Sequence, residues 1–262
     1  MNRILFDRDE LDADGCVTFG GVRAEHVLTI LHGEPGQTLK TGVVDGLIGT
    51  AVIERIDGGM VTVKCVHDRE APPPWIDLIL APPRPRVLKR LLPQLASMGV
   101  GRIILTGAAK VEKAFWGAQL LKEEVFRPLL LDGLMQAGTT AMPTLQTEKA
   151  FGRWLESGRF EEQFGGQKDR IVAHPDVCRS SVEDNTPDHV VAASMQQTAS
   201  RPVLAIGPEG GWTDDEVARL EAHGFRRMSL GPRILRTDTA TIALLAVLEA
   251  SRSATPAPAN AF

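Results

Sequence analysis

Short runs of apolar and β-branched residues alternate with turn residues over the first 70 positions of the chain. Segments 46–56 and 58–66 surround Asp57-Gly58-Gly59, and this pattern predicts two strands joined by a tight turn. Residues 24–31 have the spacing of a short helix between strands. The pattern therefore predicts a small, barrel-like β domain over residues 1–70.

Beyond residue 75, continuous apolar runs alternate with segments of helical spacing. The runs are typical of strands buried on both faces, and they lie at 76–81, 102–107, 169–175, 201–208 and 225–232. Helices are expected over 86–100, 114–137, 189–199, 214–223 and 237–250, with Pro93 interrupting the first. This alternation predicts an α/β domain with a mainly parallel sheet over 75–250.

Two segments of biased composition bound this second domain. Three prolines between Ala71 and Trp75 stiffen the chain into an extended connector, and we place the domain boundary there. Residues 251–262 are rich in Ala, Pro and Ser, so a disordered tail is expected.

Charge and cysteine content narrow the class of protein. The net charge of −4 over 262 residues argues against a strongly basic nucleic-acid binder. An RNA enzyme with a local basic patch is still compatible with this charge. Cys16, Cys65 and Cys178 are far apart, so neither a disulfide framework nor a metal site is expected. The charged N-terminus and the lack of an apolar run of about 18 residues predict a soluble cytoplasmic protein.

Three expected strands end in unusual turns, and ligands of parallel sheets bind beyond the carboxyl ends of strands. The turns contain Ala-His-Pro-Asp at 173–176, Gly-Pro-Glu-Gly-Gly-Trp at 207–212, and the segment 230–239. If the three strands are neighbours, their loops converge on one site. The glycines at 207, 210 and 211 would allow close approach of the backbone to a ligand.

Thr213 and Glu216 form a capping-box pattern, which explains that part of the loop as the start of a helix. No phosphate-binding P-loop, dinucleotide fingerprint or nucleophile elbow is present. Asp238 suits the first turn of the last helix on structural grounds. Arg233 and Arg236 flank a turn at a strand's carboxyl end, which favours a phosphate, carboxylate or nucleobase as their partner.

The segments Ile-Gly-Pro-Glu-Gly-Gly-Trp-Thr-Asp-Asp-Glu (206–216) and Leu-Gly-Pro-Arg-Ile-Leu-Arg-Thr-Asp-Thr-Ala (230–240) resemble the RsmE family, bacterial 16S rRNA (uracil-N3) methyltransferases of the SPOUT superfamily. Segments 26–37, 95–100, 135–143 and 172–176 resemble the family more weakly. The resemblance implies a PUA-like RNA-binding barrel followed by a SPOUT α/β domain with a C-terminal trefoil knot. It also implies rRNA processing in ribosome biogenesis and a homodimer, without membrane or metal.

The resemblance further implies which residues act. S-adenosyl-L-methionine would lie between two walls, one formed by Ile206, Gly207, Glu209, Gly210 and Gly211 and the other by Leu230, Gly231, Ile234, Leu235 and Arg236, with His174 nearby. Arg236 is the candidate positive group at the uracil or phosphate, and Glu209 or Asp238 would accept the proton or orient Arg236. RNA would contact the basic residues Arg84, Arg86, Lys89, Arg90 and Arg233, for which a solvated helix face is the structural alternative.

This chain departs from the family at charged positions expected to face RNA. Thr106-Gly107-Ala108 and the segment 135–139 lack the family's arginines, and His32 stands at the position of another. Three readings follow: methylation of uridine N3 in small-subunit rRNA, methylation of another RNA or base on the same fold, or a non-catalytic RNA-binding or ribosome-assembly protein. The intact segments 206–216 and 230–240 favour the enzyme over the third reading.

Overall fold

The computed structural model describes residues 2–175 and 201–254, and the expected helix at 189–199 lies outside them. The chain divides into two compact units. The first contains residues up to Pro74 together with Leu92–Gly99 and Glu123–Pro143, and the second contains the remainder. These units differ from the expected domains 1–70 and 75–250 in that residues 92–99 and 123–143 group with the N-terminal unit. The expected domain bounds stay a prediction.

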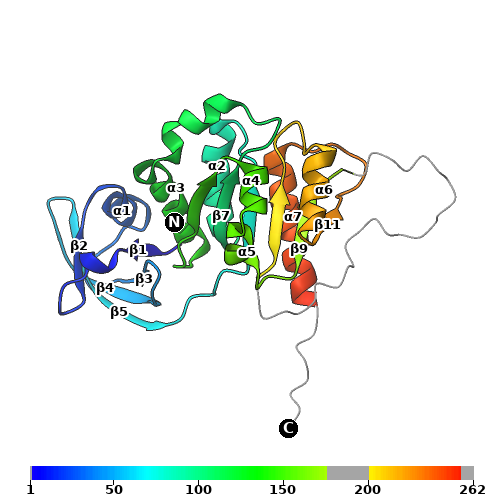
Figure 1. Cartoon of the computed structure of the whole chain (residues 1–262). Coiled ribbons are helices and arrows are strands. Elements are labelled where there is room, and N and C mark those ends of the chain that lie inside the picture. Colours follow the sequence, from blue (N-terminus) through cyan, green and yellow to red (C-terminus); the bar gives the residue numbers. More distant parts are fainter. Residues whose placement is uncertain (1, 176–200, 255–262) are drawn as a thin grey trace, which may run out of the picture. The chain divides into compact units, whose positions relative to one another are not determined.

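A five-stranded sheet of order β1-β3-β4-β5-β2 forms the first unit (Figure 1). The turn expected at Asp57-Gly58-Gly59 joins the antiparallel strands β4 and β5, which confirms that hairpin. The elements of this unit are β1 (Ile4–Phe6), η1 (Arg8–Glu10), β2 (Cys16–Phe19), α1 (Gly21–Glu25), the π-helix η2 (His26–Ile30), β3 (Thr38–Val43), β4 (Ile48–Asp57), β5 (Met60–Arg69) and α3 (Glu123–Ala137).

One face of this sheet packs into a hydrophobic core, since inward side chains alternate along the strands. Phe6 and Phe19 lie with ring centroids 5.3 Å apart, and the Arg23 guanidinium lies 5.4 Å from the Phe6 ring. Arg23 also donates to both carboxylate oxygens of Glu10. The Arg23 guanidinium, paired with Glu10, thus lies against the aromatic rings of this cluster.

Helix α2 (Pro85–Ser97) runs through Pro93, so the expected interruption there is wrong. A proline has no N–H, so the Lys89 carbonyl four residues earlier lacks its usual helical donor. Gly133 of α3 packs directly on this turn, because a Cβ on Gly133 would lie only 2.0 Å from the Pro93 carbonyl oxygen. A glycine is therefore required where the two helices meet.

A six-stranded sheet of order β11-β9-β10-β6-β7-β8 forms the second unit, and every pair in it is parallel. This confirms the α/β class with a parallel sheet. The elements of the second unit are β6 (Ile76–Leu80), β7 (Val100–Thr106), η3 (Lys113–Gly117), η4 (Gln119–Leu121), β8 (Thr144–Glu148), α4 (Phe151–Glu156), α5 (Arg159–Phe164), β9 (Arg170–Ala173), β10 (Val203–Ile206), α6 (Asp214–Ala222), β11 (Phe225–Met228) and α7 (Thr237–Ala254).

Two expected helix boundaries are wrong. The helix expected at 114–137 begins only at Glu123, since two 3-10 helices, η3 and η4, occupy the preceding residues. Helix α7 continues to Ala254, four residues into the stretch expected as a tail, and residues 255–262 lie outside the described part. Within residues 2–175 and 201–254, no helix is both long and apolar enough to cross a membrane.

A carboxylate interrupts the apolar strand β6. Asp77 is fully buried and accepts a hydrogen bond of 2.8 Å from Gln167 Nε2. Arg201 and Arg102 place guanidinium nitrogens 3.4 Å and 3.9 Å from its oxygens. Opposite charges and a hydrogen bond compensate the burial of this carboxylate at the amino ends of the parallel strands.

Trp154 lies at the centre of the second unit's core, 2% exposed, with the Phe160 and Phe164 rings edge-on at 5.3 Å and 6.2 Å. Truncation of such a side chain leaves a cavity, so Trp154→Ala should lower the free energy of unfolding by about 3–5 kcal/mol. Denaturant titration checks this. Val66→Ala, at a residue 61% exposed, serves as the control with a change of about 0.5 kcal/mol or less.

Candidate functional site

Strand β9 lies between β10 and β11, so the three strands with unusual ends are neighbours. Arg170 pairs with Val203 on one side and with Phe225 on the other. Because all three strands are parallel and in register, their carboxyl-end loops emerge at the same edge of the sheet. The expected convergence of these loops is confirmed.

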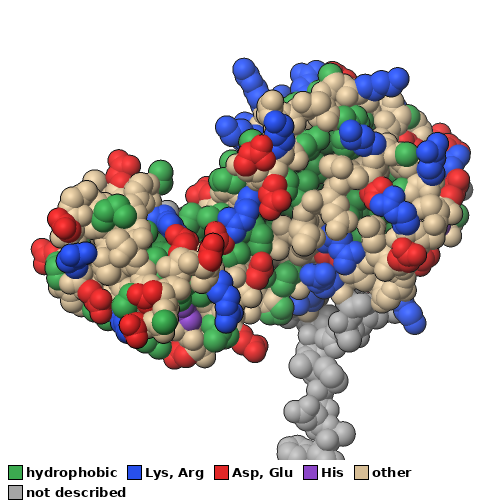
Figure 2. Space-filling view, turned by 60° about the vertical axis from the view of Figure 1, so that its left-hand side comes forward, with side chains coloured by type: hydrophobic (Ala, Val, Ile, Leu, Met, Phe, Trp, Pro, Cys, Tyr) green, Lys and Arg blue, Asp and Glu red, His purple; other side chains and the backbone are tan. Residues whose placement is uncertain are grey.

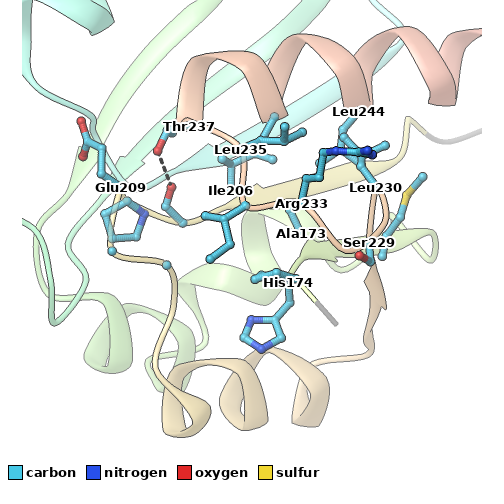
Figure 3. Close-up of a pocket in the computed structure, with 18 of the residues that line it drawn as sticks. Ala173, His174, Ile206, Glu209, Ser229, Leu230, Arg233, Leu235, Thr237 and Leu244 are labelled. Carbon is cyan, nitrogen blue, oxygen red and sulfur yellow. Dashed lines mark hydrogen bonds between the residues drawn. The ribbon is translucent and has the colours of Figure 1, made fainter. Parts of the chain in front are cut away.

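The loops enclose a cavity of about 260 Å³ (Figure 3). Ten of the residues expected at a cofactor line it: His174, Ile206, Gly207, Glu209, Gly210, Gly211, Leu230, Gly231, Ile234 and Leu235. Arg233, expected at RNA, lines it as well. Arg236 does not belong to the lining, nor does Asp238.

The first wall is the loop after β10. Gly211 has φ +71°, a conformation that favours glycine, and its N–H donates to the Pro208 carbonyl at 2.8 Å. A Cβ on Gly207 would lie 3.0 Å from the backbone nitrogen of Trp212, so the loop folds closely upon itself. Trp212 is 3% exposed and stacks on Phe151 at 5.2 Å, which anchors the loop in the core.

A second loop, after β7, supports this wall from outside. Lys110 Nζ donates to the Gly210 carbonyl at 2.7 Å, and the Lys110 side chain occupies the space that a Cβ on Gly210 would need. The Ala109 N–H donates to Glu216 Oε1 at 2.7 Å. Glu216, 7% exposed, also completes the expected capping box with Thr213, so one carboxylate joins the loop after β7 to the start of α6.

Glu209 is engaged in a structural contact. Its Oε1 accepts a 3.0 Å hydrogen bond from the Arg84 N–H, directly before α2. In Figure 3 the carboxylate lies at one end of the pocket, far from Arg233 and Ser229. The negative charge at a helix N-terminus is favourable, which gives Glu209 a capping role.

The second wall is the loop between β11 and α7. Gly231 has φ +100°, and the Thr237 hydroxyl donates to the Gly207 carbonyl at 3.5 Å, which links the two walls. Ile234 is 82% exposed and Leu235 37% exposed at the rim. An isoleucine so exposed beside a pocket leaves apolar surface that a ligand or another chain would cover.

The charged residues next to this wall face outward. Arg236 is exposed and its carbonyl accepts the Ala240 N–H at the start of α7. Asp238 Oδ2 lies 3.6 Å from an Arg90 guanidinium nitrogen, at an exposed position of α2. Arg86 and Lys89 are exposed on the same helix and Arg84 is exposed directly before it, so four of the five residues expected at RNA lie on a solvated surface at α2.

His174 contributes a polar atom with no partner. The backbone N–H of His174 donates to the Met228 carbonyl at 3.1 Å, which continues the pairing of β9 with β11. The ring Nδ1 is buried and makes no hydrogen bond within the described part of the chain. In Figure 3 the ring points away from Ile206 and Leu235, so His174 lines the pocket without presenting this nitrogen to its centre.

Sequence reasoning missed part of the lining and all of its outer support. Further lining residues are Ala173, Pro175, Pro208, Met228, Ser229, Thr237, Ala240 and Leu244. Five of these lie inside the recognised segments 172–176, 206–216 and 230–240, while Met228, Ser229 and Leu244 lie within four residues of the last segment. Lys110 and Ala109 lie about 100 residues before their partners and belong to no motif.

A parallel α/β sheet whose three adjacent carboxyl-end loops enclose one pocket defines a ligand-binding domain of the kind that holds nucleotide-like cofactors.

The sequence model for the RNA methyltransferase domain matches residues 70–249, and the chain belongs to this family. Ribosomal RNA small subunit methyltransferase E of Treponema pallidum is 29% identical over 97% of this chain and 92% of its own length. Methyltransferase E 1 of Borreliella burgdorferi is 24% identical over 93% and 95%. The resemblance to the RsmE family is confirmed.

Two solved structures share the fold. A Legionella pneumophila methyltransferase in complex with S-adenosylmethionine has a TM-score of 0.71 and 24% identity, covering 95% of this chain and 97% of its own. Small subunit methyltransferase E of Neisseria gonorrhoeae, bound to the same cofactor, has a TM-score of 0.71, 20% identity and the same coverage.

The contact between Lys110 and Gly210 generates a testable expectation about the pocket wall. Lys110→Ala removes both the ammonium donor and the packed stem, so amide hydrogen exchange at residues 210–212 should become about tenfold faster. Lys113→Ala, at an exposed lysine of the same loop with no hydrogen bond or ion pair in the described residues, is the control. Equal exchange in both variants would show that Lys110 does not hold the wall.

Proposed function

We propose that this protein transfers a methyl group from S-adenosyl-L-methionine to N3 of a uridine in small-subunit ribosomal RNA. The observation that carries the proposal is the single pocket formed by the loops after β9, β10 and β11, which contain the two most specific sequence segments. Membership in the RNA methyltransferase family and the names of the relatives support the reaction class and the RNA.

The residues present fit the cofactor. Leu230, Leu244 and Ile206 offer apolar surface, and the two glycine-containing loops offer backbone donors and acceptors. His174, directly after β9, completes the lining. Such a mixture of apolar surface with a few polar groups suits a ligand with a flat base and a polar tail. The cofactor would supply a methyl group activated by the positively charged sulfonium sulfur to which it is bonded.

The chain would then orient the uracil and stabilise charge on it. N3 is a poor nucleophile until its proton leaves, so a positive group near the developing anion lowers the barrier. Arg236 is our candidate for that group, since it directly follows the pocket residue Leu235 and its side chain is exposed to an incoming substrate. Arg233, in the pocket lining, would contact an RNA phosphate.

Of the two candidate carboxylates, the contacts favour Asp238 as the group that accepts the proton or orients Arg236. Asp238 is two residues from Arg236, and its side chain is 28% exposed beside Arg90. Glu209 already accepts the Arg84 N–H as a helix cap. The charge-charge contact with Arg90 places a basic residue of α2 next to the same site.

RNA would be attracted locally rather than by the whole protein. The face drawn in Figure 2 intermixes acidic and basic side chains, in keeping with the net charge of −4. Exposed Arg86, Lys89 and Arg90 lie on α2, and exposed Arg84, directly before it, donates its backbone N–H to Glu209 of the pocket wall. Contacts of this kind to phosphates supply affinity that falls with salt.

Three finer features of the family belong to the proposal. The five-stranded N-terminal sheet would be a PUA-like RNA-binding barrel, and the loops around the pocket would form a trefoil knot. The protein would act as a homodimer, for which the support is Ile234, 82% exposed at the pocket rim. A second copy covering this rim would remove the apolar surface from water.

The reaction is tested with purified protein, labelled methyl donor and small ribosomal subunits from cells that lack the activity. Methylation at N3 removes a donor from the pairing edge of uracil, so reverse transcription should stop at the modified uridine, and mass spectrometry should find 3-methyluridine there. Methylation elsewhere would favour another RNA or base. No transfer and no cofactor binding would favour the non-catalytic reading.

Cofactor binding tests the placement of the pocket. A valine at Gly210 would meet the Lys110 side chain, where a Cβ already lies 2.8 Å from Cδ, so wall and support cannot both keep their positions. Gly210→Val should raise the Kd for S-adenosylmethionine at least about tenfold, as measured by calorimetry. Gly166→Val is the matched control, since a Cβ there meets no atom within 4 Å. Unchanged affinity in Gly210→Val would contradict the placement.

Arg236→Ala tests the catalytic proposal. Loss of a group that stabilises transition-state charge should lower kcat about 10²-fold, with cofactor Kd and thermal stability unchanged. Single-turnover methyl transfer measures the effect. Arg153→Ala, at an exposed arginine of α4 outside the pocket lining, should retain full turnover. Wild-type kcat in Arg236→Ala would remove Arg236 from the mechanism.

A further inference from the structure

The carboxyl-end edge of the second unit's sheet continues beyond the pocket. Every pair in the order β11-β9-β10-β6-β7-β8 is parallel, so the loops after β7 and β8 emerge at the same edge as the loops that form the pocket. Strands β10 and β8 are three positions apart, a separation of roughly 14 Å. One RNA strand could therefore reach both places. The function proposed above assigns no RNA contact to these two loops.

Trp116, in the loop after β7, differs from the other tryptophans of the chain. Trp75, Trp154 and Trp212 are at most 8% exposed, whereas Trp116 is only half-buried on the short helix η3. An indole carries a large apolar surface, and leaving part of it in water is unfavourable. A ligand with a flat ring would cover that surface.

Contacts on both sides hold η3 in place. Phe115, directly before Trp116, lines a small apolar cavity together with Pro85 and Leu88. Val111, before the start of η3, packs against the hydrophobic core of the second unit. The Trp116 ring is thus attached to a backbone that is anchored in the sheet and at α2, as a preorganised binding surface requires.

Lys149, in the loop after β8, lies next to the Trp116 ring. Its ammonium nitrogen is 5.8 Å from the ring centroid, within the range of a cation–π contact. A Cβ on Gly107 would lie only 2.1 Å from the Lys149 carbonyl oxygen, so the two loops touch backbone to backbone. Lys149 is exposed and makes no hydrogen bond or ion pair with any described residue, which leaves its ammonium available to a phosphate.

The charges on these loops favour an anionic ligand. Residues 107–122 contain three lysines and one acid, Glu112. Lys113 is exposed on η3 and forms no ion pair in the part of the chain that the structure describes. Glu148, at the end of β8, is already paired with Arg159. A half-buried aromatic ring beside unpaired lysines is the combination that binds single-stranded nucleic acid.

We propose that Trp116, Lys113 and Lys149 form a stacking platform for one unpaired nucleotide of the RNA beside the methylated uridine. The base would stack on the Trp116 ring, and the two ammonium groups would contact neighbouring phosphates. The inference rests on the proposed function for the identity of the ligand as RNA. Because every base has a flat face, the platform would position the strand without selecting its sequence.

Substitutions of Trp116 separate stacking from packing in the full-length protein. Trp116→Leu keeps an apolar side chain but removes the ring, so the KM for small ribosomal subunits should rise about tenfold. Trp116→Phe keeps a ring and should stay within about threefold of wild type. In both variants kcat, the Kd for S-adenosylmethionine and thermal stability should be those of wild type. A wild-type KM in Trp116→Leu would overturn the proposal.

The phosphate contacts are tested by the dependence of KM on salt. Lys113→Ala and Lys149→Ala should each reduce the slope of log KM against log salt by about 0.7, the value for one phosphate contact on a single strand. Lys168→Ala is the matched control, since it removes an exposed lysine directly before β9, at the opposite edge of the sheet. Slopes in the first two variants equal to that of Lys168→Ala would contradict their part in the platform.

Tryptophan fluorescence separates this inference from the proposed function, because it requires no methyl transfer. Labelled single-stranded oligouridine should quench the fluorescence of wild type on binding, since a stacked base contacts the half-buried indole. Trp116→Phe should bind the oligonucleotide, as measured by anisotropy of its label, with little quenching.

The outcomes of this measurement are distinct. If wild type transfers no methyl group, but its fluorescence is quenched and this quenching is lost in Trp116→Phe, the platform inference holds and the proposed reaction fails. If methyl transfer occurs while quenching is the same in wild type and Trp116→Phe, only the platform inference fails.

Discussion

The parallel pairing of β9 with both β10 and β11 is the constraint on which the candidate active site depends. Each pair holds its partner strand in register, so the residues that follow Ala173, Ile206 and Met228 leave the sheet together. None of the three loops could enclose a pocket alone. The buried apolar strands stabilise this order, and the buried Asp77 with its arginine partners fixes the opposite end of the sheet.

The pocket walls owe their shape to contacts from outside the pocket. The Glu216 carboxylate accepts from Ala109 and Thr213, Lys110 donates to Gly210, and Glu209 caps α2. Backbone groups of the walls are thus held by side chains, of which Lys110 and Glu216 lie outside the pocket lining and Glu209 lies within it. Preorganisation of this kind reduces the entropy lost when a ligand binds.

Much of the second unit could be predicted from the sequence, because strands buried on both faces leave continuous apolar runs and loops at their carboxyl ends leave glycines and prolines. The capping box at Thr213 and Glu216 was also readable, since its two residues are only three positions apart. Helix boundaries were less accessible: 3-10 helices at Lys113–Gly117 and Gln119–Leu121 have no strong local signal. The expected interruption at Pro93 was wrong because α2 continues through it, and the close packing of Gly133 against the Pro93 carbonyl leaves no local signal in the sequence.

The partners that complete the pocket are far apart along the chain. Arg84 meets Glu209 across 125 positions, Ala109 meets Glu216 across 107, and the lining extends to Leu244. During synthesis the N-terminal part emerges first, so β6, β7 and the loop with Lys110 must wait for most of the remaining chain. A nascent or C-terminally truncated chain would therefore lack the pocket although most of its sheet had already been translated. The ligand site can therefore form only after the chain has been synthesised at least as far as Leu244.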